Sequence, residues 1–159
     1  MDNISPIDGR YQKITSVLSE YFSEFGFFKY RLYVELLYFI ALIDLLPELE
    51  IIRTTDIKDQ VISIWEKFNN EDYLKIKNYE TILKHDIKAL EYFIKEKMND
   101  IGLKHFETFI HFGITSQDIN TSANILALKN GLHYCIIPSI KNIIESLSLF
   151  SYNCKDDIM

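Results

Sequence analysis

The sequence has few residues that bend or break a chain, with five Gly and three Pro among 159 residues. This scarcity excludes a protein of many short strands, which would need frequent turns. Only two Cys occur. Cys135 and Cys154 have neither the spacing of a metal site nor the number of a disulfide framework, so we expect reduced thiols.

Clusters of Lys or Arg are also missing, and the formal net charge is −6. Nucleic-acid-binding proteins neutralise phosphates with clustered basic side chains, so the sequence argues against a nucleic-acid partner. Binding of a small anionic ligand is still compatible with this charge, because such a ligand needs only a few convergent donors. None of the four His has the spacing from a carboxylate that is typical of a metal site, and we expect no metal.

No apolar run is long enough to span a membrane or shaped like a secretion signal. The start, residues 1–3, lacks a basic residue and no apolar run follows it, so we expect no signal peptide. The most apolar stretch, residues 32–46, is shorter than the roughly 20 residues that cross a bilayer. It also contains Glu35 and Asp44. We therefore predict a cytoplasmic protein with a buried central helix and no membrane contact.

The residues that are abundant predict an all-α fold. Apolar residues make up 48% of the chain and include ten Tyr and eleven Phe, which indicates an aromatic core. Helical spacing begins at Ile14, Gly26 interrupts it, and residues 27–46 form the central helix before Pro47. A further helix follows Thr55 as N-cap, and a weaker one ends near residue 80.

Two more helices complete the predicted order and suggest two domains. One begins at Asp86 and ends near Gly102, and a long one opens at the capping box of Thr115 and Asp118. Large and small residues alternate on the long helix, and a narrow apolar seam follows Pro138. We expect a helical domain over 1–110 and the first helices of a truncated bundle over 111–159. The seam comprises Ile140, Ile143, Ile144, Leu147 and Phe150.

The first candidate site lies at the N-terminal turn, where Asp8-Gly9-Arg10-Tyr11 precedes a helix. A guanidinium next to a helix start can hold phosphate through two parallel charge-assisted bonds, and Gly lets the backbone come close. The alternative is an ordinary surface Arg after an Asp-Gly turn.

The second candidate is Lys84-His85-Asp86 at the start of a helix. Imidazole can donate to an anion or shuttle a proton near neutral pH, and the helix N-terminus adds positive potential. Alternatively, Asp86 is only the helix cap and His85 is a partly exposed bystander.

The third candidate is Thr115-Ser116, where hydroxyls and free backbone N–H groups can bind carboxylate or phosphate oxygens. An uncharged polar stripe continues along this helix at i, i+3, i+4 and i+7. It comprises Gln117, Asn120, Thr121 and Asn124. The alternative is a capped helix with one hydrated face.

Together these segments resemble adenylosuccinate lyase in their order and spacing over nearly the whole chain. The segments are Ser5–Tyr11, Phe22–Gly26, Lys84–Phe93, Phe109–Phe112 and Thr115–Asn120. The Thr-Ser-x-Asp-x-Asn element is similar across the wider fumarase and aspartase superfamily. The N-terminal motif and the His-Asp helix narrow the resemblance to the purine enzyme, and they disfavour relatives such as argininosuccinate lyase.

The resemblance implies β-elimination of fumarate from adenylosuccinate, giving AMP, and from the succinyl-carboxamide intermediate of purine synthesis, without a cofactor. By position, Arg10 and Tyr11 would hold the phosphate, and Thr115 and Ser116 the succinyl end. His85, an auxiliary catalytic residue, and Asp86 would orient the substrate and the general acid. Lys84 stands where the family often has Asn, so only a backbone contact there would be retained.

The family's catalytic His and Ser segments are absent from these 159 residues, so we expect a fragment that does not turn over substrate alone. The family is a homotetramer whose active sites each combine three subunits. A different class of function is also compatible with the sequence, namely a catalytically dead helical module that binds other proteins through its apolar seam. The coding sequence after Met159 would distinguish these possibilities.

Overall fold

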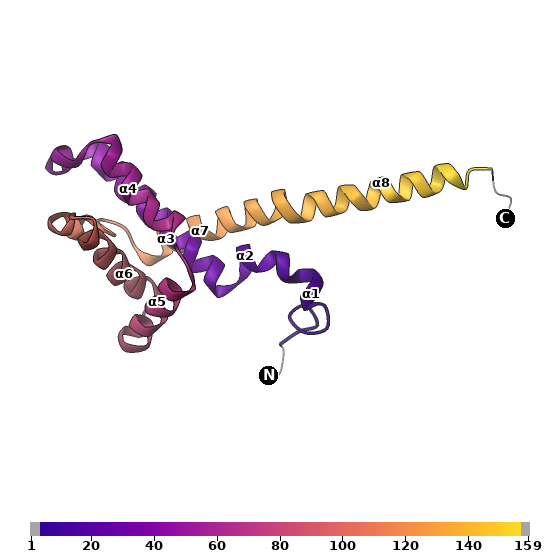
Figure 1. Cartoon of the computed structure of the whole chain (residues 1–159), viewed down its shortest axis with the longest axis horizontal. Helices are drawn as coiled ribbons and strands as arrows, with labels where there is room; N and C mark the ends of the chain where they lie inside the picture. Colours follow the sequence, from indigo (N-terminus) through magenta and orange to yellow (C-terminus); the bar gives the residue numbers. More distant parts are fainter. Residues whose placement is uncertain (1–3, 157–159) are drawn as a thin grey trace.

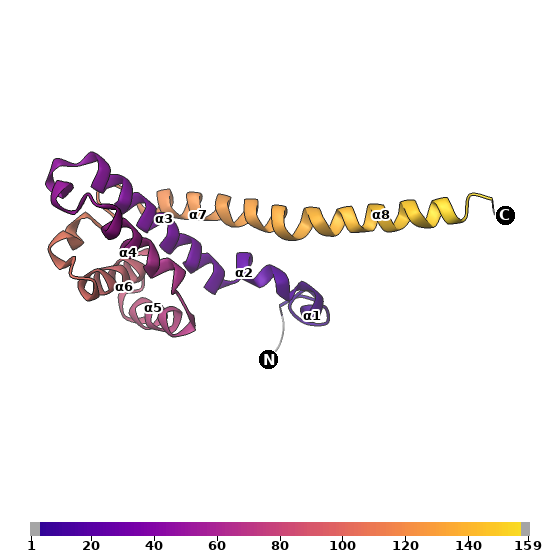
Figure 2. The ribbon, with the colours of Figure 1, turned by 45° about the horizontal axis from the view of Figure 1, so that its top comes forward.

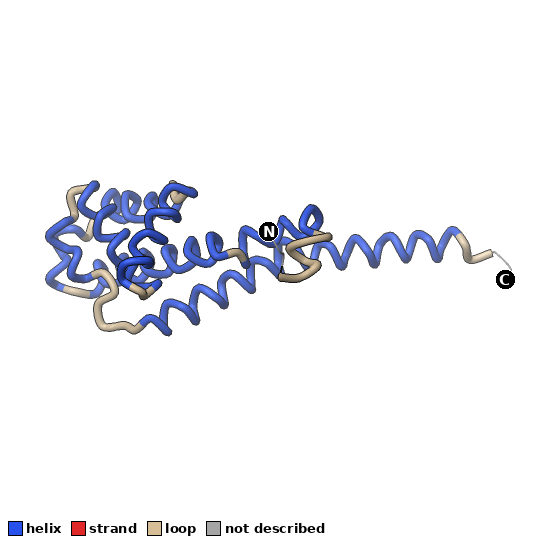
Figure 3. The backbone as a smooth tube through the Cα atoms, turned by 90° about the horizontal axis from the view of Figure 1, so that it is seen from below, coloured by secondary structure: helices blue, strands red, loops and turns tan. Residues whose placement is uncertain are grey.

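The computed structural model describes residues 4–156, and it confirms the all-α prediction, because these residues contain no strand. Figure 3 shows helices joined by short loops. No helix within the described range is long and apolar enough to cross a membrane. The elements are α1 (Gln12–Thr15), η1 (Ser16–Leu18), α2 (Ser19–Phe22), α3 (Glu24–Leu45), η2 (Pro47–Ile52), α4 (Thr55–Glu66), α5 (Asn70–Leu83), α6 (Asp86–Asp100), η3 (Lys104–Phe109), α7 (Ser116–Gly131), the π-helical turn η4 (Leu132–Ile136) and α8 (Ile137–Asn153).

Helix α3 is the centre of the core, as the apolar stretch predicted. It contacts α4, α5, α6 and α7. The buried residues of α3 recur every three or four positions, so they form one face of the helix, which packs against its neighbours. Its fully buried side chains are Phe28, Leu32, Leu36, Phe39 and Ile43.

The predicted interruption at Gly26 is wrong by three residues, because the helix breaks at Ser23. Ser23 has an extended backbone with ψ of 164°, and its hydroxyl accepts a hydrogen bond from the Gly26 N–H at 3.0 Å. Gly26 lies in the first turn of α3. A Cβ at this position would be 2.4 Å from the carbonyl oxygen of Glu20, so the close approach of α2 requires glycine.

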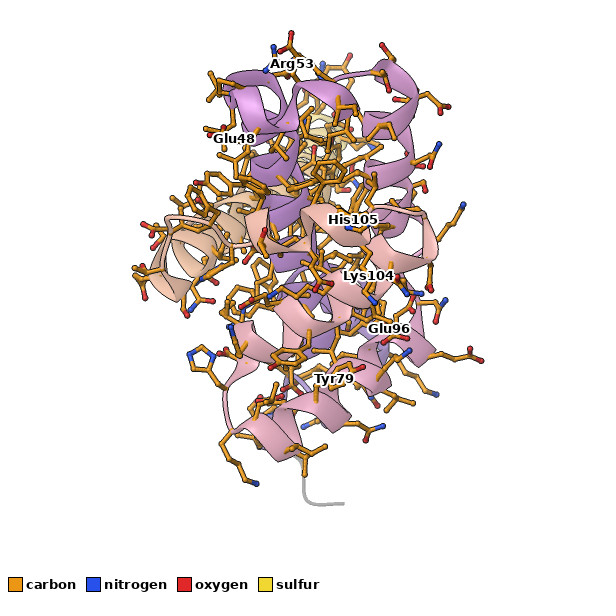
Figure 4. The ribbon with its side chains drawn as sticks, turned by 90° about the vertical axis from the view of Figure 1, so that its left-hand side faces the viewer. Glu48, Arg53, Tyr79, Glu96, Lys104 and His105 are labelled. Atoms are coloured by element: carbon orange, nitrogen blue, oxygen red, sulfur yellow. The ribbon has the colours of Figure 1, made fainter. Side chains whose placement is uncertain are left out.

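Helices α5 and α6 pack against one another beside α3 (Figures 1 and 2). The Tyr79 hydroxyl donates to the Glu96 carboxylate at 2.9 Å, and Figure 4 labels both side chains.

The predicted N-cap of α4 is wrong by one residue. Thr54, rather than Thr55, has the extended backbone, and its hydroxyl accepts from the Ile57 N–H at 3.3 Å. Helix α6 ends before Gly102, as predicted.

Helices α7 and α8 form one long helix through the π-helical turn, and its C-terminal half extends away from the other helices (Figure 1). Ile119, Ala123 and Ala127 are buried on α7, which contacts α3 and α2. The small residues permit this close approach, as predicted. None of the α8 residues is buried. The domain boundary near residue 110 stays a prediction, since residues on both sides of it pack against α3.

Candidate functional site

The N-terminal turn is organised by Asp8, which the sequence analysis had not distinguished from its neighbours. Its carboxylate accepts hydrogen bonds from the Ser5 N–H at 2.7 Å and the Ser5 hydroxyl at 3.1 Å. The backbone hydrogen bond from Ser5 lowers the pKa of Asp8 below its ordinary value. Arg10 is exposed beside the Tyr11 ring, with 5.5 Å between the guanidinium carbon and the ring centroid. The turn therefore presents Arg10 to solvent.

His85 caps α6, and Asp86 is the first residue of that helix. The Nδ1 atom of His85 accepts a hydrogen bond from the Lys88 N–H at 3.1 Å. The alternative interpretation, in which Asp86 caps the helix, is therefore wrong, because the imidazole of His85 is the cap. With Nδ1 as the acceptor, a neutral ring carries its proton on Nε2. Since the side chain is 51% exposed, Nε2–H is a donor that an anion could reach.

Lys84 ends α5 in the left-handed conformation, with φ of +54°. This turn aligns the end of α5 with the start of α6, and the Lys84 N–H donates to the Glu80 carbonyl at 2.8 Å. Its side chain is exposed and lines an open hollow of about 350 Å³ together with Lys77, Glu80 and Thr81. A left-handed backbone is more easily adopted by Asn than by Lys, and Asn is the residue that the resemblance leads us to expect at this position.

A buried guanidinium joins the second and third candidate segments. Arg31 of α3 is 7% exposed. Its Nη2 lies 2.8 Å from Asp86 Oδ2, and its Nε donates to Asn120 Oδ1 at 2.9 Å. The start of α6 and the second turn of α7 are thus linked through one side chain. Burial lowers the pKa of Arg31, and the neighbouring Asp86 opposes that shift.

The sequence analysis missed Arg31, although a signal for it was present. The residue lies in a helix that is apolar on nearly every side, where an arginine has to be buried or at the edge of the core. A buried charge is retained in a fold only when it is paired and hydrogen-bonded. Its partners lie far away in sequence and could not be named from the spacing.

The start of α7 has the predicted acid-capped geometry. The Asp118 carboxylate accepts from the Thr115 N–H at 2.7 Å and from the Thr115 hydroxyl at 2.9 Å. These bonds lower the pKa of Asp118. The polar stripe is divided, because Asn120 points to Arg31 whereas Gln117 donates to Thr121 at 2.9 Å on the exposed surface. The hydrated face of the alternative interpretation therefore accounts for only part of the stripe.

A second buried polar pair lies just before this helix. Glu35 of α3 is 2% exposed, and its Oε1 lies 2.6 Å from His111 Nδ1. His111 has a left-handed backbone, with φ of +59°. Burial raises the pKa of Glu35, and His111 counteracts this in part. The pair fixes the turn that leads to Thr115, and the Tyr38 hydroxyl secures the same turn by donating to the Phe112 carbonyl at 2.7 Å.

Two of the three candidate segments are thus brought together, and the third is not. Within residues 4–156, no hydrogen bond or ion pair connects Arg10 with His85 or Ser116. The described range also has no group of three or more His, Cys, Asp or Glu side chains that could hold a metal ion. The chain therefore presents a linked pair of segments, with donors at two helix starts, and a separate exposed Arg10.

Comparison with known proteins gives matches over nearly the whole chain. A family model described as "Lyase" matches residues 9–159. Adenylosuccinate lyase of Buchnera aphidicola subsp. Schizaphis graminum is 45% identical over 97% of this chain and 34% of its own length. The Dictyostelium discoideum enzyme of the same name is 46% identical over 96% of this chain, and the Vibrio cholerae enzyme is 37% identical over 96%. The chain spans about a third of the length of the curated relatives that it matches.

Proposed function

Since this chain belongs to the lyase family, whose model covers residues 9–159, we propose that it serves the adenylosuccinate lyase reaction. The reaction is the β-elimination of fumarate from adenylosuccinate, which gives AMP, and from succinyl-aminoimidazole-carboxamide ribotide in purine biosynthesis. The proposal is supported by similarity to adenylosuccinate lyases from three organisms. It includes a cytoplasmic location, which fractionation of the source cells would test.

The observation that carries the proposal is the bond from buried Arg31 to both motif segments. It holds the starts of α6 and α7 together, and helix starts are favourable sites for anions. We assign the succinyl carboxylates to Thr115 and Ser116. We assign the orientation of the substrate and of the general acid to His85 and Asp86.

Arg10 and Tyr11 are assigned to the nucleotide phosphate. Because Arg10 has no bond to the other two segments within the described chain, this assignment is most compatible with a site that more than one copy completes. Lys84 would contact the substrate through its backbone, the contact that the family resemblance retains at this position. No cofactor is required by the proposed elimination.

The experiment that tests the function is fumarate release from adenylosuccinate by the full-length protein. We expect activity, and we expect His85→Ala to lower kcat by roughly 10²-fold, the scale of a substrate misplaced by about 1 Å. Full activity in His85→Ala would remove this residue from the site. A full-length protein that binds neither adenylosuccinate nor AMP would favour the interaction module instead.

The phosphate role of Arg10 is tested by titrating AMP into the full-length protein at fixed salt, because salt screens exposed charges. We expect Arg10→Ala to weaken binding by about 1.5–3 kcal/mol, the scale of a hydrogen bond to a charged group. Arg10→Lys should restore only part, since an ammonium lacks the planar two-bond fork. Equal affinity in all three proteins would make Arg10 an ordinary surface residue.

We propose that the exposed apolar seam of α8 binds other copies of the chain in a homo-oligomer, a tetramer by the family resemblance. Ile140, Ile143, Ile144, Leu147 and Phe150 are each 51–67% exposed. An apolar stripe of this length on a projecting helix is typical of an interface. Leu147→Lys should reduce the assembly to smaller species in light scattering. An unchanged mass would contradict the role of the seam, and Lys141→Ala on the same helix is the matched control.

A further inference from the structure

A single buried side chain connects three helices at the place where the proposed substrate-binding segments begin. Arg31 on α3 reaches Asp86 on α6 at 2.8 Å and Asn120 on α7 at 2.9 Å. We infer that Arg31 is a positioning residue, which holds His85 and Ser116 at a fixed separation so that both can address one substrate. This inference rests on the proposed lyase function and deepens it.

The guanidinium is held rigidly on its flat face as well as at its edge. Its central carbon lies 3.9 Å from the centroid of the Phe27 ring and 5.1 Å from that of Phe28. Arginine donors form a planar fork, so two acceptors bound to one guanidinium have a set angle and distance between them. Stacking on an aromatic ring fixes the plane of the fork. Arg31 therefore works as a spacer of constant length between α6 and α7.

The two acceptors lie where a shift would be transmitted directly to the binding groups. Asp86 immediately follows His85, so its position sets where the imidazole cap of α6 lies. Asn120 is four residues after Ser116, and residues at i and i+4 lie on the same face of a helix. The bond to Asn120 consequently fixes the rotation of α7 that orients the Ser116 hydroxyl.

Arg31 acts through these residues and does not itself contact substrate. It is almost fully buried, and Nε and Nη2 are already bonded to protein acceptors. Its position explains why the chain retains a charge in an apolar helix. A buried pair contributes little net stability compared with apolar packing, and its best-supported value is in defining one arrangement.

The test is steady-state kinetics of fumarate release by the full-length protein carrying Arg31→Met or Arg31→Lys. Met keeps an apolar stem but has neither the guanidinium nor its charge, and we expect kcat to fall roughly 10²-fold, the scale of a misplacement of about 1 Å. Lys keeps the charge without the fork and should restore part of kcat. Circular dichroism and light scattering establish that each variant is folded and assembled.

The matched control is Lys97→Met, which breaks another ion pair between helices. Lys97 Nζ lies 2.8 Å from Asp72 Oδ1, between α6 and α5 and away from both motifs. This variant should lower the melting temperature and leave kcat and KM unchanged. If Arg31→Met does not fold, Asn120→Ala provides a milder variant, because it removes only one of the two acceptors of Arg31. It should still lower kcat, by roughly tenfold, since a smaller displacement of α7 costs less than the loss of both bonds.

Hydrogen exchange gives a readout that is independent of turnover. We expect faster exchange of the Lys88 and Asp118 amides in Arg31→Met, but not in Lys97→Met, because their helix starts would no longer be held together. A folded Arg31→Met with wild-type kcat and KM would overturn the inference, even if its melting temperature fell. A wild-type protein that releases no fumarate would overturn the proposed function itself, whereas the first result leaves that function intact.

Discussion

Replacing His85 by Ala or by Asn separates its role as the cap of α6 from its proposed role in substrate binding. The imidazole caps α6 by accepting from the Lys88 N–H at 3.1 Å, with an extended backbone at φ of −150° and ψ of 116°. Asn is a strong N-cap residue and Ala is a poor one. We expect His85→Ala to lower the free energy of unfolding by about 1 kcal/mol, and His85→Asn to lower it by less.

The proposed substrate role predicts a different pattern, because neither Ala nor Asn can supply the Nε2–H donor of the imidazole. Both variants should therefore lose activity to a similar extent, while only His85→Ala loses stability. The assays are urea unfolding and thermal unfolding, both followed by circular dichroism. The thermal midpoint should fall by roughly 2–4 °C for each kcal/mol lost in a chain of this size. Wild-type stability of His85→Ala would refute the capping role. Recovery of activity in His85→Asn would refute the need for imidazole.

Two further substitutions test the packing around the site. Glu35→Gln should flatten the pH dependence of stability. Because burial raises the folded pKa of Glu35, the stability that this group contributes is fully present below its ordinary pKa of 4.5 and is lost as pH rises through the folded pKa. Urea midpoints that fall in parallel for both proteins over this range would contradict this prediction. Gly26→Ala should destabilise by about 1–3 kcal/mol, because the strain of a Cβ 2.4 Å from the Glu20 oxygen exceeds the roughly 1 kcal/mol gained in helix propensity. A raised melting temperature of Gly26→Ala would show that α2 moves aside freely.

The sequence by itself determined those features that depend on neighbours along the chain. Apolar periodicity depends on residues three or four apart, and it correctly predicted the all-α fold and the central helix α3. The acid cap at Thr115 and Asp118 was predicted for the same reason, since both partners lie within one turn. Errors at helix starts were of one to three residues, because Thr54 and Thr55 are equally good caps by type and only backbone angles distinguish them.

Only the tertiary structure decided which distant side chains meet. Arg31 and Asn120 are 89 positions apart, and Glu35 and His111 are 76 apart, so no local pattern links them. Each pair forms because α3 is covered by the turn before α7 and by α7 itself, and a buried charge requires a partner from whichever helix covers it. The sequence could only propose residues whose chemistry suits an anion. The packing of α3 against α6 and α7 determined that His85 and Ser116 begin helices held by one guanidinium, and that Arg10 lies apart from them.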